Sequence, residues 1–260
     1  MRIALVRDVA ASLAECELSF VARAPIDVAL AQRQHAGYAA ALAGLGCRVV
    51  ALPALADHPD AVFVEDTALV FDELAVATRP GAASRRGEVD SVAAALGAWR
   101  PLRAIEAPGT IDGGDVMRIG HAVHVGASAR SNHEAMTQLH ELLAPYGYRV
   151  EPVPIRGCLH LKSAVTCIAD GTLLLQPQWV DRDAFPGFAI VEVDPAEEHA
   201  ANALRIGDAV VYPDCFPRTR ERIERAGVRV VAVDVSELQK AEGAVTCCSI
   251  VFEEAPSPGR

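Results

Sequence analysis

A short apolar run rich in β-branched residues, preceded by a helix-like stretch, recurs along this chain and constrains its fold more than any other feature. Three of these runs follow a glycine, at Gly46, Gly147 and Gly227. The five runs begin near residues 48, 101, 148, 187 and 228. Repeats with a period of roughly 20 to 50 residues are typical of supersecondary units that bury a shared core only when they stack.

Each apolar run leads into a polar segment and then into further apolar strands. The sequences RIGHA at residues 118–122 and IADGT at residues 168–172 contain the glycine turns that join paired strands into hairpins. Segments rich in Ala, Leu, Glu and Arg predict helices over residues 27–45, 85–98, 131–146 and 217–226. We expect Asp27, Ser131 and Ser236 to act as N-terminal helix caps.

A repeated unit of strand, polar corner, hairpin and helix predicts an α/β fold with pseudo-symmetric packing around an axis. The polar corners would then meet at one end of that axis and form a site. Alternating helices and strands are also compatible with an open doubly wound sheet. The segment GGDVMRIG lacks the G-x-G-x-x-G fingerprint and precedes a strand, which favours the repeat. Because no Gly/Ser-rich or Pro-rich linker divides the chain, we expect one domain over residues 1–260.

Charge and cysteine content narrow the class of protein. A formal net charge of -10 argues against nucleic acid, whose phosphates need clustered Lys and Arg, and favours a small cationic partner. The first residues do not resemble a signal peptide, and no apolar run approaches the roughly 18 residues of a membrane span. We therefore expect a cytoplasmic protein with no membrane partner. Seven cysteines without a Cys-x-x-Cys pair point to free thiols rather than disulfides or structural zinc.

Cys247 and His160 each stand at the entry to an apolar strand, at two of the polar corners. Alone, such a cysteine is usually a small buried hydrophobe and such a histidine a structural residue. Together they have a further use, because an imidazole can hold a thiolate and carry a proton to a leaving group. Adjacent residues of a strand point to opposite faces, so only one of Cys247 and Cys248 can be the nucleophile.

Carboxylates occupy two further corners. Asp112 and Asp115 lie in TIDGGDVM, which predicts either a plain turn or a carboxylate that orients the histidine, with glycines that let the backbone approach a substrate. Glu65 and Asp66 lie in an otherwise apolar run, where burial is costly without a cation. A guanidinium ligand would supply that cation in bidentate form.

Basic residues flank the same corners. Arg85 and Arg130 lie near expected helix starts, where they are either exposed or able to bind an α-carboxylate. The remaining histidines are scattered without the spacing of metal ligands. We therefore predict no metal site and no cofactor.

Five motifs match one enzyme family in the right order along nearly the whole chain. They are D-x-V-F-V-E-D at residues 60–66, T-R-P-G-A-x-S-R-R at 78–86, I-D-G-G-D at 111–115, H-L-K-S at 160–163 and T-C-C-S at 246–249. With Q-R-Q-H at residues 32–35, they resemble dimethylarginine dimethylaminohydrolase, a family of the guanidino-group modifying enzymes. The resemblance implies a five-bladed pseudo-symmetric α/β propeller, or pentein, which agrees with the repeat.

The resemblance also implies roles for individual residues. Cys247 would be the nucleophile, His160 the acid/base and Asp112 the acid that holds His160. Guanidinium recognition would fall on Asp66, with Glu65 and Asp60 nearby. The substrate carboxylate would be bound by Arg85 and Arg130, and the amino-acid end would lie near Leu18, on a mobile entrance loop, and the carbonyl of Ala241.

The implied reaction is hydrolysis of Nω-methylated L-arginine, dimethylated or monomethylated, to L-citrulline and the methylamine through a covalent cysteine adduct. The cationic substrate should itself favour the Cys247 thiolate. Arginine deiminases carry an acid two residues after the histidine, where this chain has Lys162, so plain arginine is the weaker substrate prediction. An arginine deiminase, a citrulline hydrolase or a non-catalytic propeller binding protein are the alternatives. The sequence is compatible with a homodimer but contains no feature that specifies one.

Overall fold

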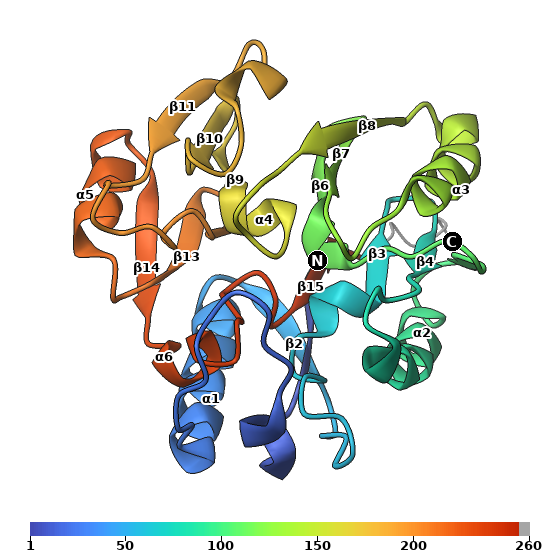
Figure 1. The fold of residues 1–260 in the computed structure, drawn as a ribbon, viewed down its shortest axis with the longest axis horizontal. Coiled ribbons are helices and arrows are strands. Elements are labelled where there is room, and N and C mark those ends of the chain that lie inside the picture. Colours follow the sequence, from blue (N-terminus) through green and yellow to red (C-terminus); the bar gives the residue numbers. More distant parts are fainter. Residues whose placement is uncertain (255–260) are drawn as a thin grey trace.

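Hairpin turns and crossover connections produce the same small sheet five times. The computed structural model describes residues 1–254, in which five three-stranded sheets are arranged around an axis (Figure 1). Every sheet combines one antiparallel pair of strands with one parallel pair. A parallel third strand needs a crossover connection, and the longer helices lie in these connections. The predicted α/β propeller of five pseudo-repeats is confirmed, and the open doubly wound sheet is excluded.

Four sheets are built from consecutive strands, and the remaining one joins both ends of the chain. In the latter, β1 (Arg2–Arg7) pairs in parallel with β2 (Cys47–Leu52) and antiparallel with β15 (Ile250–Glu253). The pairing of β1 with β15 closes the ring. The consecutive sheets are β3 (Ala68–Val70), β4 (Ala75–Ala77) and β5 (Leu102–Ala104); β6 (Val116–Ile119), β7 (Ala122–Ala127) and β8 (Arg149–Pro154); β9 (Val165–Ala169), β10 (Thr172–Leu175) and β11 (Ala189–Glu192); and β12 (Leu204–Ile206), β13 (Ala209–Pro213) and β14 (Arg229–Val233).

The four longer helices occupy the connections between the second and third strands, on the outside of the ring (Figure 1). The four predicted helices are confirmed, and the five predicted strand starts fall within two residues of β2, β5, β8, β11 and β14. In the connection from β10 to β11, the described residues contain only the short 3-10 turn η6 (Arg182–Ala184). The helices are α1 (Val28–Gly44), α2 (Val89–Leu96) after η3 (Ala83–Glu88), α3 (His133–Leu143) followed by η5 (Ala144–Tyr146), and α5 (Pro217–Arg225).

One of the three predicted helix caps is confirmed, and two are wrong. The Asp27 side chain accepts the backbone N–H of Leu30 at 2.9 Å and caps α1. Ser131 does not cap α3, because Asn132 does so. The hydroxyl of Ser131 instead donates to the buried carboxylate of Asp115 at 2.6 Å. The Ser131 hydroxyl thus forms a tertiary hydrogen bond instead of the local hydrogen bond that would cap the helix.

Ser236 is the first residue of the short helix α6 (Ser236–Gln239) rather than its cap. The side chain of Gln34 in α1 donates to the Ser236 hydroxyl at 2.8 Å and accepts the backbone N–H of Glu237 at 3.0 Å. A glutamine from a distant helix therefore performs the capping function predicted for the serine.

The apolar core is divided into clusters that lie between neighbouring sheets. One cluster joins Ile3 of β1 with Ala75 of β4 and Leu96 of α2, and another joins Val76 of β4 with Val125 of β7. Because burial of apolar area takes place between the sheets, the axis itself is left to polar corners and to cavities.

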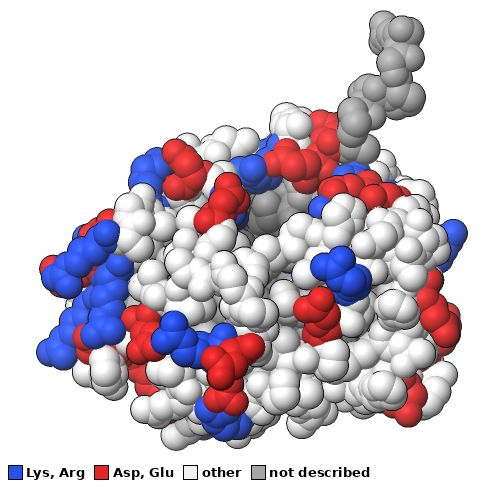
Figure 2. Space-filling model, turned by 90° about the horizontal axis from the view of Figure 1, so that it is seen from above, with Lys and Arg blue, Asp and Glu red and all other residues white. Residues whose placement is uncertain are grey.

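The outer surface gives two further observations. Among residues 1–254, no helix combines the length and the apolar character that crossing a membrane requires. Figure 2 shows one face of the molecule, where Lys and Arg are interspersed with Asp and Glu and do not form a continuous basic surface.

Candidate active site

The segments that lead into the first strand of each sheet meet on the axis. Asp66 lies in the one-turn helix η2 (Val64–Thr67), and Asp112 directly precedes η4 (Gly113–Asp115). His160 directly precedes α4 (Leu161–Ala164), and Cys247 lies in the turn before β15. The predicted convergence of the polar corners is therefore observed.

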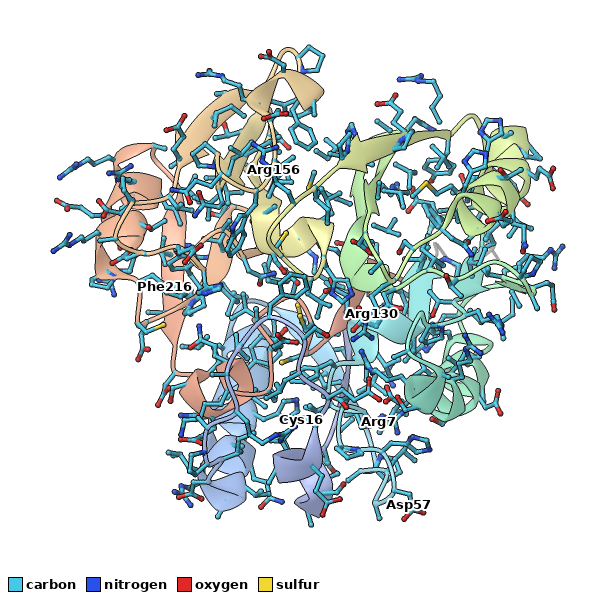
Figure 3. All side chains as sticks on the ribbon, in the orientation of Figure 1. Arg7, Cys16, Asp57, Arg130, Arg156 and Phe216 are labelled. Atoms are coloured by element: carbon cyan, nitrogen blue, oxygen red, sulfur yellow. The ribbon has the colours of Figure 1, made fainter. Side chains whose placement is uncertain are left out.

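A small cavity of about 30 Å³ lies at this end of the axis. Such a volume holds on the order of two waters, so an amino-acid substrate would have to displace part of its wall. Figure 3 shows that Arg130 lies near the centre of the ring, whereas Asp57 lies at its periphery. The cavity, called the pocket below, is lined by Glu17, Asp60, Phe63, Asp66, Arg85, Arg130, Leu159, His160, Ala241, Glu242 and Cys247.

His160 and Asp112 form a buried hydrogen-bonded pair. The Nε2 atom of His160 lies 3.0 Å from Oδ2 of Asp112. The other oxygen of Asp112 accepts the backbone N–H of Gly81 at 2.8 Å. Asp112 has no exposed surface and does not line the pocket. It is therefore placed behind the imidazole, where it can fix the ring and stabilise its charged form.

Opposite charges around His160 favour its protonated state. Burial by itself would lower the pKa of His160, but the charges of Asp66 and Asp115 and the bond to Asp112 raise the pKa to about 9. Burial would likewise raise the pKa of Asp66, but His160, Arg85 and a hydrogen bond from the backbone of Gly114 lower that pKa to about 2. At neutral pH the pocket thus contains an imidazolium beside an ionised carboxylate.

The two glycines of the Ile-Asp-Gly-Gly-Asp motif pack against site residues, which corrects their predicted contact with a substrate. A Cβ atom on Gly114 would lie 2.6 Å from Nδ1 of His160 and 3.0 Å from Oδ1 of Asp66. A Cβ atom on Gly113 would lie 1.9 Å from the carbonyl oxygen of Glu65. Neither glycine lines the pocket. The missing side chains let the corners of η2, η4 and α4 approach one another.

Cys247 and Cys248 have different surroundings, although both precede β15 and neither lies on the strand as predicted. Cys247 lines the pocket, whereas Cys248 is fully buried in the apolar cluster beside α1. Burial and the charges of Glu65 and Asp66 raise the pKa of Cys247 to about 12. The free protein therefore holds this thiol protonated, and a nearby cation would be needed to ionise it.

Both buried carboxylates of η2 have cationic partners within the protein, which corrects the expectation that a ligand must supply them. Lys162 donates to Oε1 of Glu65 at 2.5 Å, and the hydroxyl of Thr246 donates to Oε2 at 2.8 Å. Arg85 donates to Oδ2 of Asp66 at 2.5 Å. Glu65 and Lys162 do not line the pocket but face a second cavity of about 640 Å³ farther along the axis.

Arg85 and Arg130 both line the pocket but differ in how far their guanidinium groups are engaged. Arg85 is buried, with bonds to Asp66, to Glu88 and to the carbonyl oxygens of residues 60 and 63. Arg130 has only long contacts, 3.8 Å to Asp112 and 3.4 Å to the hydroxyl of Ser19. Arg130 is therefore the arginine that is freer to bind an anion.

The remaining predicted residues divide between the pocket and its surroundings. Asp60 and Ala241 line the pocket, and Oδ2 of Asp60 accepts the backbone N–H of Glu17 at 3.2 Å. Leu18 does not line it and packs instead against the apolar cluster beside α1. Seven of the ten residues predicted from the sequence therefore line the pocket. Asp112 lies behind the pocket wall, and Glu65 and Leu18 lie outside the pocket.

Glu242 is a functional candidate that the sequence did not reveal. Its carboxylate accepts the backbone N–H groups of three consecutive residues, Ser19, Phe20 and Val21, and so fastens the entrance loop over the pocket. Glu242 has a left-handed backbone with φ of 59°, which few residues other than glycine adopt. The Glu-Gly pair at residues 242–243 indicates a turn at most, because the bonded residues are more than 200 positions away in the sequence.

Within the described residues, one group of side chains has the spacing of metal ligands. It consists of Asp66, Asp112 and His160, whose nearest atoms lie within 4.8 Å of one another. Each is already engaged: Asp66 with Arg85 and Gly114, and Asp112 with His160. The cluster is thus accounted for by ion pairing and proton handling.

Comparisons with known proteins identify relatives of this chain, although no protein-family model matches it. An N(G),N(G)-dimethylarginine dimethylaminohydrolase of Pseudomonas aeruginosa is 38% identical over 228 residues, which is 87% of this chain and 90% of that protein. The enzyme of the same name from Streptomyces coelicolor is 39% identical over 255 residues, 96% of this chain and 97% of that protein.

Two solved structures of such enzymes superpose closely. A cysteine-to-serine variant of the Pseudomonas aeruginosa enzyme, in complex with citrulline, has a TM-score of 0.92 at 36% identity and covers 96% of this chain and 98% of its own. A histidine-to-glycine variant, as an adduct with S-methyl-L-thiocitrulline, has a TM-score of 0.93 at 36% identity and covers 97% of this chain and 100% of its own.

A five-bladed α/β propeller with a cysteine, a histidine and carboxylates on its axis defines a pentein of the guanidino-group modifying class. The sequence identity of 38 to 39% over most of the chain narrows the class further. The chain belongs to the dimethylarginine dimethylaminohydrolase family.

Proposed function

We propose that this protein hydrolyses Nω-methylated L-arginine to L-citrulline and the corresponding methylamine. One observation carries the proposal: His160, held from behind by Asp112, shares a small buried pocket with Cys247 and Asp66. The names of the relatives and the citrulline bound to one of them support the same reaction.

Substrate binding follows from the charges of the pocket. A planar guanidinium forms its strongest pairs with carboxylates, and Asp66 stays ionised because its pKa is about 2. Asp60 is the second carboxylate of the wall. At the entrance, Arg130 is the group best suited to the substrate carboxylate. We assign Arg85 to holding Asp66, in place of the carboxylate contact predicted from the resemblance.

Cys247 supplies the nucleophile once a cation lies beside it. Since burial and neighbouring carboxylates keep the thiol protonated in the free protein, the positive guanidinium lowers its pKa on binding, and the thiol proton passes to solvent. The Cys247 sulfur then forms a bond to the central guanidinium carbon. An adduct described for a relative supports a covalent intermediate.

His160 moves the protons of both half-reactions. As an imidazolium with a pKa of about 9, it donates a proton to the methylated nitrogen, and the C–N bond breaks to release the amine. The neutral ring then takes a proton from water, whose oxygen attacks the carbon of the thiouronium adduct. The C–S bond breaks and the sulfur leaves as a thiolate. The remaining hydroxyl proton of the product passes to that thiolate, which yields neutral citrulline and restores the thiol, and His160 is again an imidazolium. The released amine takes up the proton that the thiol had given to solvent.

We base the preference for a methylated substrate on a carboxylate that is missing from one position of this chain. By the resemblance of the sequence motifs, the second acid of an arginine deiminase corresponds to Lys162, and this lysine pairs with Glu65 outside the pocket. No carboxylate from that position competes for the methylated nitrogen. We therefore expect plain arginine and citrulline to be poorer substrates than dimethylarginine and monomethylarginine.

The test compares the two adjacent cysteines. With Cys247→Ser, citrulline formation from dimethylarginine should fall by at least roughly a thousandfold, because an alcohol is a much weaker nucleophile than a thiolate. The matched control, Cys248→Ser, should keep wild-type kcat and lose only stability. Undiminished turnover by the first variant would end the assignment, and a wild-type protein inactive on all four substrates would favour a binding protein.

Three further predictions accompany the proposal. Pairing of β1 with β15 supports a single catalytic domain over residues 1–260, of which residues 255–260 lie outside the described part. A homodimer and a cytoplasmic location stay predictions from the sequence. Sedimentation velocity measures the oligomeric state, and fractionation of the source cells measures the location.

A further inference from the structure

Asp115 is a fully buried carboxylate that the proposed reaction does not use. Its Oδ1 atom accepts the backbone N–H of Leu161 at 2.9 Å. Its Oδ2 atom accepts the hydroxyl groups of Ser128 at 2.5 Å and Ser131 at 2.6 Å. Three donors from two other segments therefore compensate a charge that would be costly to bury alone.

Each of these partners is attached to a residue of the site. The hydroxyl of Ser131 also accepts the backbone N–H of Asp112 at 3.3 Å. The hydroxyl of Ser128 accepts the backbone N–H of Arg130 at 3.0 Å. Leu161 directly follows His160 in the chain. One carboxylate thus connects the acid/base, the acid behind it and the arginine at the entrance.

The local packing is built to admit this carboxylate. A Cβ atom on Gly126 would lie 2.6 Å from Oδ1 of Asp115 and 2.9 Å from Cβ of Leu161. The glycine in β7 therefore gives Asp115 the room to reach Leu161. Asp115 does not line the pocket, so it acts on the reaction only through its neighbours.

We propose that Asp115 is a positioning residue, which sets His160, Asp112 and Arg130 in their mutual orientation through Leu161, Ser131 and Ser128. The proposal rests on the function proposed above. It separates two branches: Ser131 leads to the proton-transfer pair and Ser128 leads to the substrate carboxylate. Misplacement of reacting groups by about 1 Å can lower a rate by roughly a hundredfold, so such a framework has measurable consequences.

The two branches predict opposite kinetic signatures on dimethylarginine. Ser131→Ala removes the acceptor for the Asp112 N–H and should lower kcat about tenfold with KM nearly unchanged. Ser128→Ala removes the acceptor for the Arg130 N–H and should raise KM about fivefold with kcat nearly unchanged. Asp115→Asn, which keeps the shape but loses one acceptor oxygen, should show both effects.

A control variant separates positioning from stability. Thr219 in α5 is buried and does not line the pocket, and its hydroxyl accepts the backbone N–H of Asp194 at 2.9 Å. Thr219→Ala should lower Tm as much as the serine variants do and leave kcat and KM at wild-type values. If the serine variants behave like this control, Asp115 has a structural role only and the proposal is overturned.

A second readout does not depend on turnover. The charged groups that face His160 are Asp66, Asp112 and Asp115, and the hydrogen bond from Asp112 helps to raise its pKa. In an NMR titration of the imidazole, Ser131→Ala should lower the pKa of His160, because Asp112 is released, and Ser128→Ala should leave it unchanged. Equal values in all three proteins would overturn the proposal. If the wild type has no activity on methylarginines, the proposed function fails while this titration still decides the role of Asp115.

Discussion

The two ends of the propeller axis carry charge in different ways. The larger cavity is lined by four cations and four carboxylates, and each cation is paired with a carboxylate of the same wall. The pocket is lined by the carboxylates Glu17, Asp60, Asp66 and Glu242 against two arginines and His160. The pairs of the larger cavity are Arg2–Glu253, Arg118–Asp72, Arg205–Asp170 and Lys162–Glu65.

Of the two cavities, the pocket is the one suited to bind a cation. At the larger cavity every charge on the wall is already compensated, so a charged ligand gains little there. At the pocket, four carboxylates face three cationic groups when His160 is protonated, and an excess of negative charge is left. Burial, together with the charges of Glu65 and Asp66, keeps the Cys247 thiol protonated until a cation arrives.

The two neighbouring residues Glu65 and Asp66 each serve a different end of the axis. Both lie in η2, a 3-10 turn with three residues per turn, so their side chains project about 120° apart. Glu65 therefore reaches Lys162 at the larger cavity, and Asp66 reaches Arg85 at the pocket. The same carboxylate chemistry thus serves two ends of the axis.

The pair Asp66→Asn and Glu65→Gln gives the largest expected effect. Asp66→Asn should lower kcat/KM on dimethylarginine by roughly a thousandfold, because a neutral amide neither holds the guanidinium nor supports the His160 imidazolium. Glu65→Gln should change kcat/KM less than tenfold but lower the free energy of unfolding by at most about 3 kcal/mol, since it leaves the partly buried Lys162 ammonium without a charge partner. Steady-state kinetics and urea denaturation measure both. Equal kinetic losses would mean that the two ends do not differ in function.

The pH dependence of stability is the second way to separate the ends. His160 has a folded-state pKa of about 9, above the unfolded value of roughly 6.5. Its contribution to stability is therefore fully present below pH 6.5 and is lost as the pH rises through 9, by roughly 1.4 kcal/mol for each pH unit of that window. Denaturant titrations from pH 6 to 10 should show this loss in the wild type and not in His160→Gln. Identical pH profiles would contradict the charged cluster.

The smallest expected effect concerns the loop above the pocket. Glu242→Gln keeps the size of the side chain but offers one acceptor oxygen to three backbone N–H groups. The loop should open more often, so KM should rise about threefold and trypsin should cleave faster after Arg23. Glu141→Gln, the same substitution at an exposed position of α3, is the matched control and should leave the cleavage rate unchanged. A Glu242 variant with wild-type cleavage would show that the carboxylate does not fasten the loop.

Much of the fold could be predicted because short-range sequence patterns determine where its strands, turns and helices form. Glycine turns and β-branched runs placed the starts of β2, β5, β8, β11 and β14 within two residues, and helix-forming segments placed α1, α2, α3 and α5. The caps at Ser131 and Ser236 could not be predicted, because Asp115 and Gln34 bind these hydroxyls from distant segments. Local helix propensity does not indicate that a distant side chain will bind the serine hydroxyl in place of the helix backbone.

The sequence predicts those site residues whose type is required by the chemistry. It does not predict the role of a residue when that role depends on which side chain or backbone group it contacts in the fold. The motifs pointed to Cys247, His160 and Asp112, and the fold brings them together. The resemblance assigned Arg85 to the substrate, but its bonds to Asp66 and Glu88 depend on side-chain geometry that no motif encodes. Glu242 was missed for the same reason, since its partners lie in the entrance loop at the other end of the sequence.

In the proposed reaction, the cation that completes the pocket comes from the substrate and ionises Cys247. The most direct test is the ultraviolet thiolate absorbance at neutral pH, with and without a non-hydrolysable amidinium analogue of arginine, with Cys247→Ser as the blank. We expect no Cys247 thiolate in the free protein, whose thiol has a pKa of about 12, and about one thiolate per chain in the complex. Equal ionisation with and without the analogue would contradict the account.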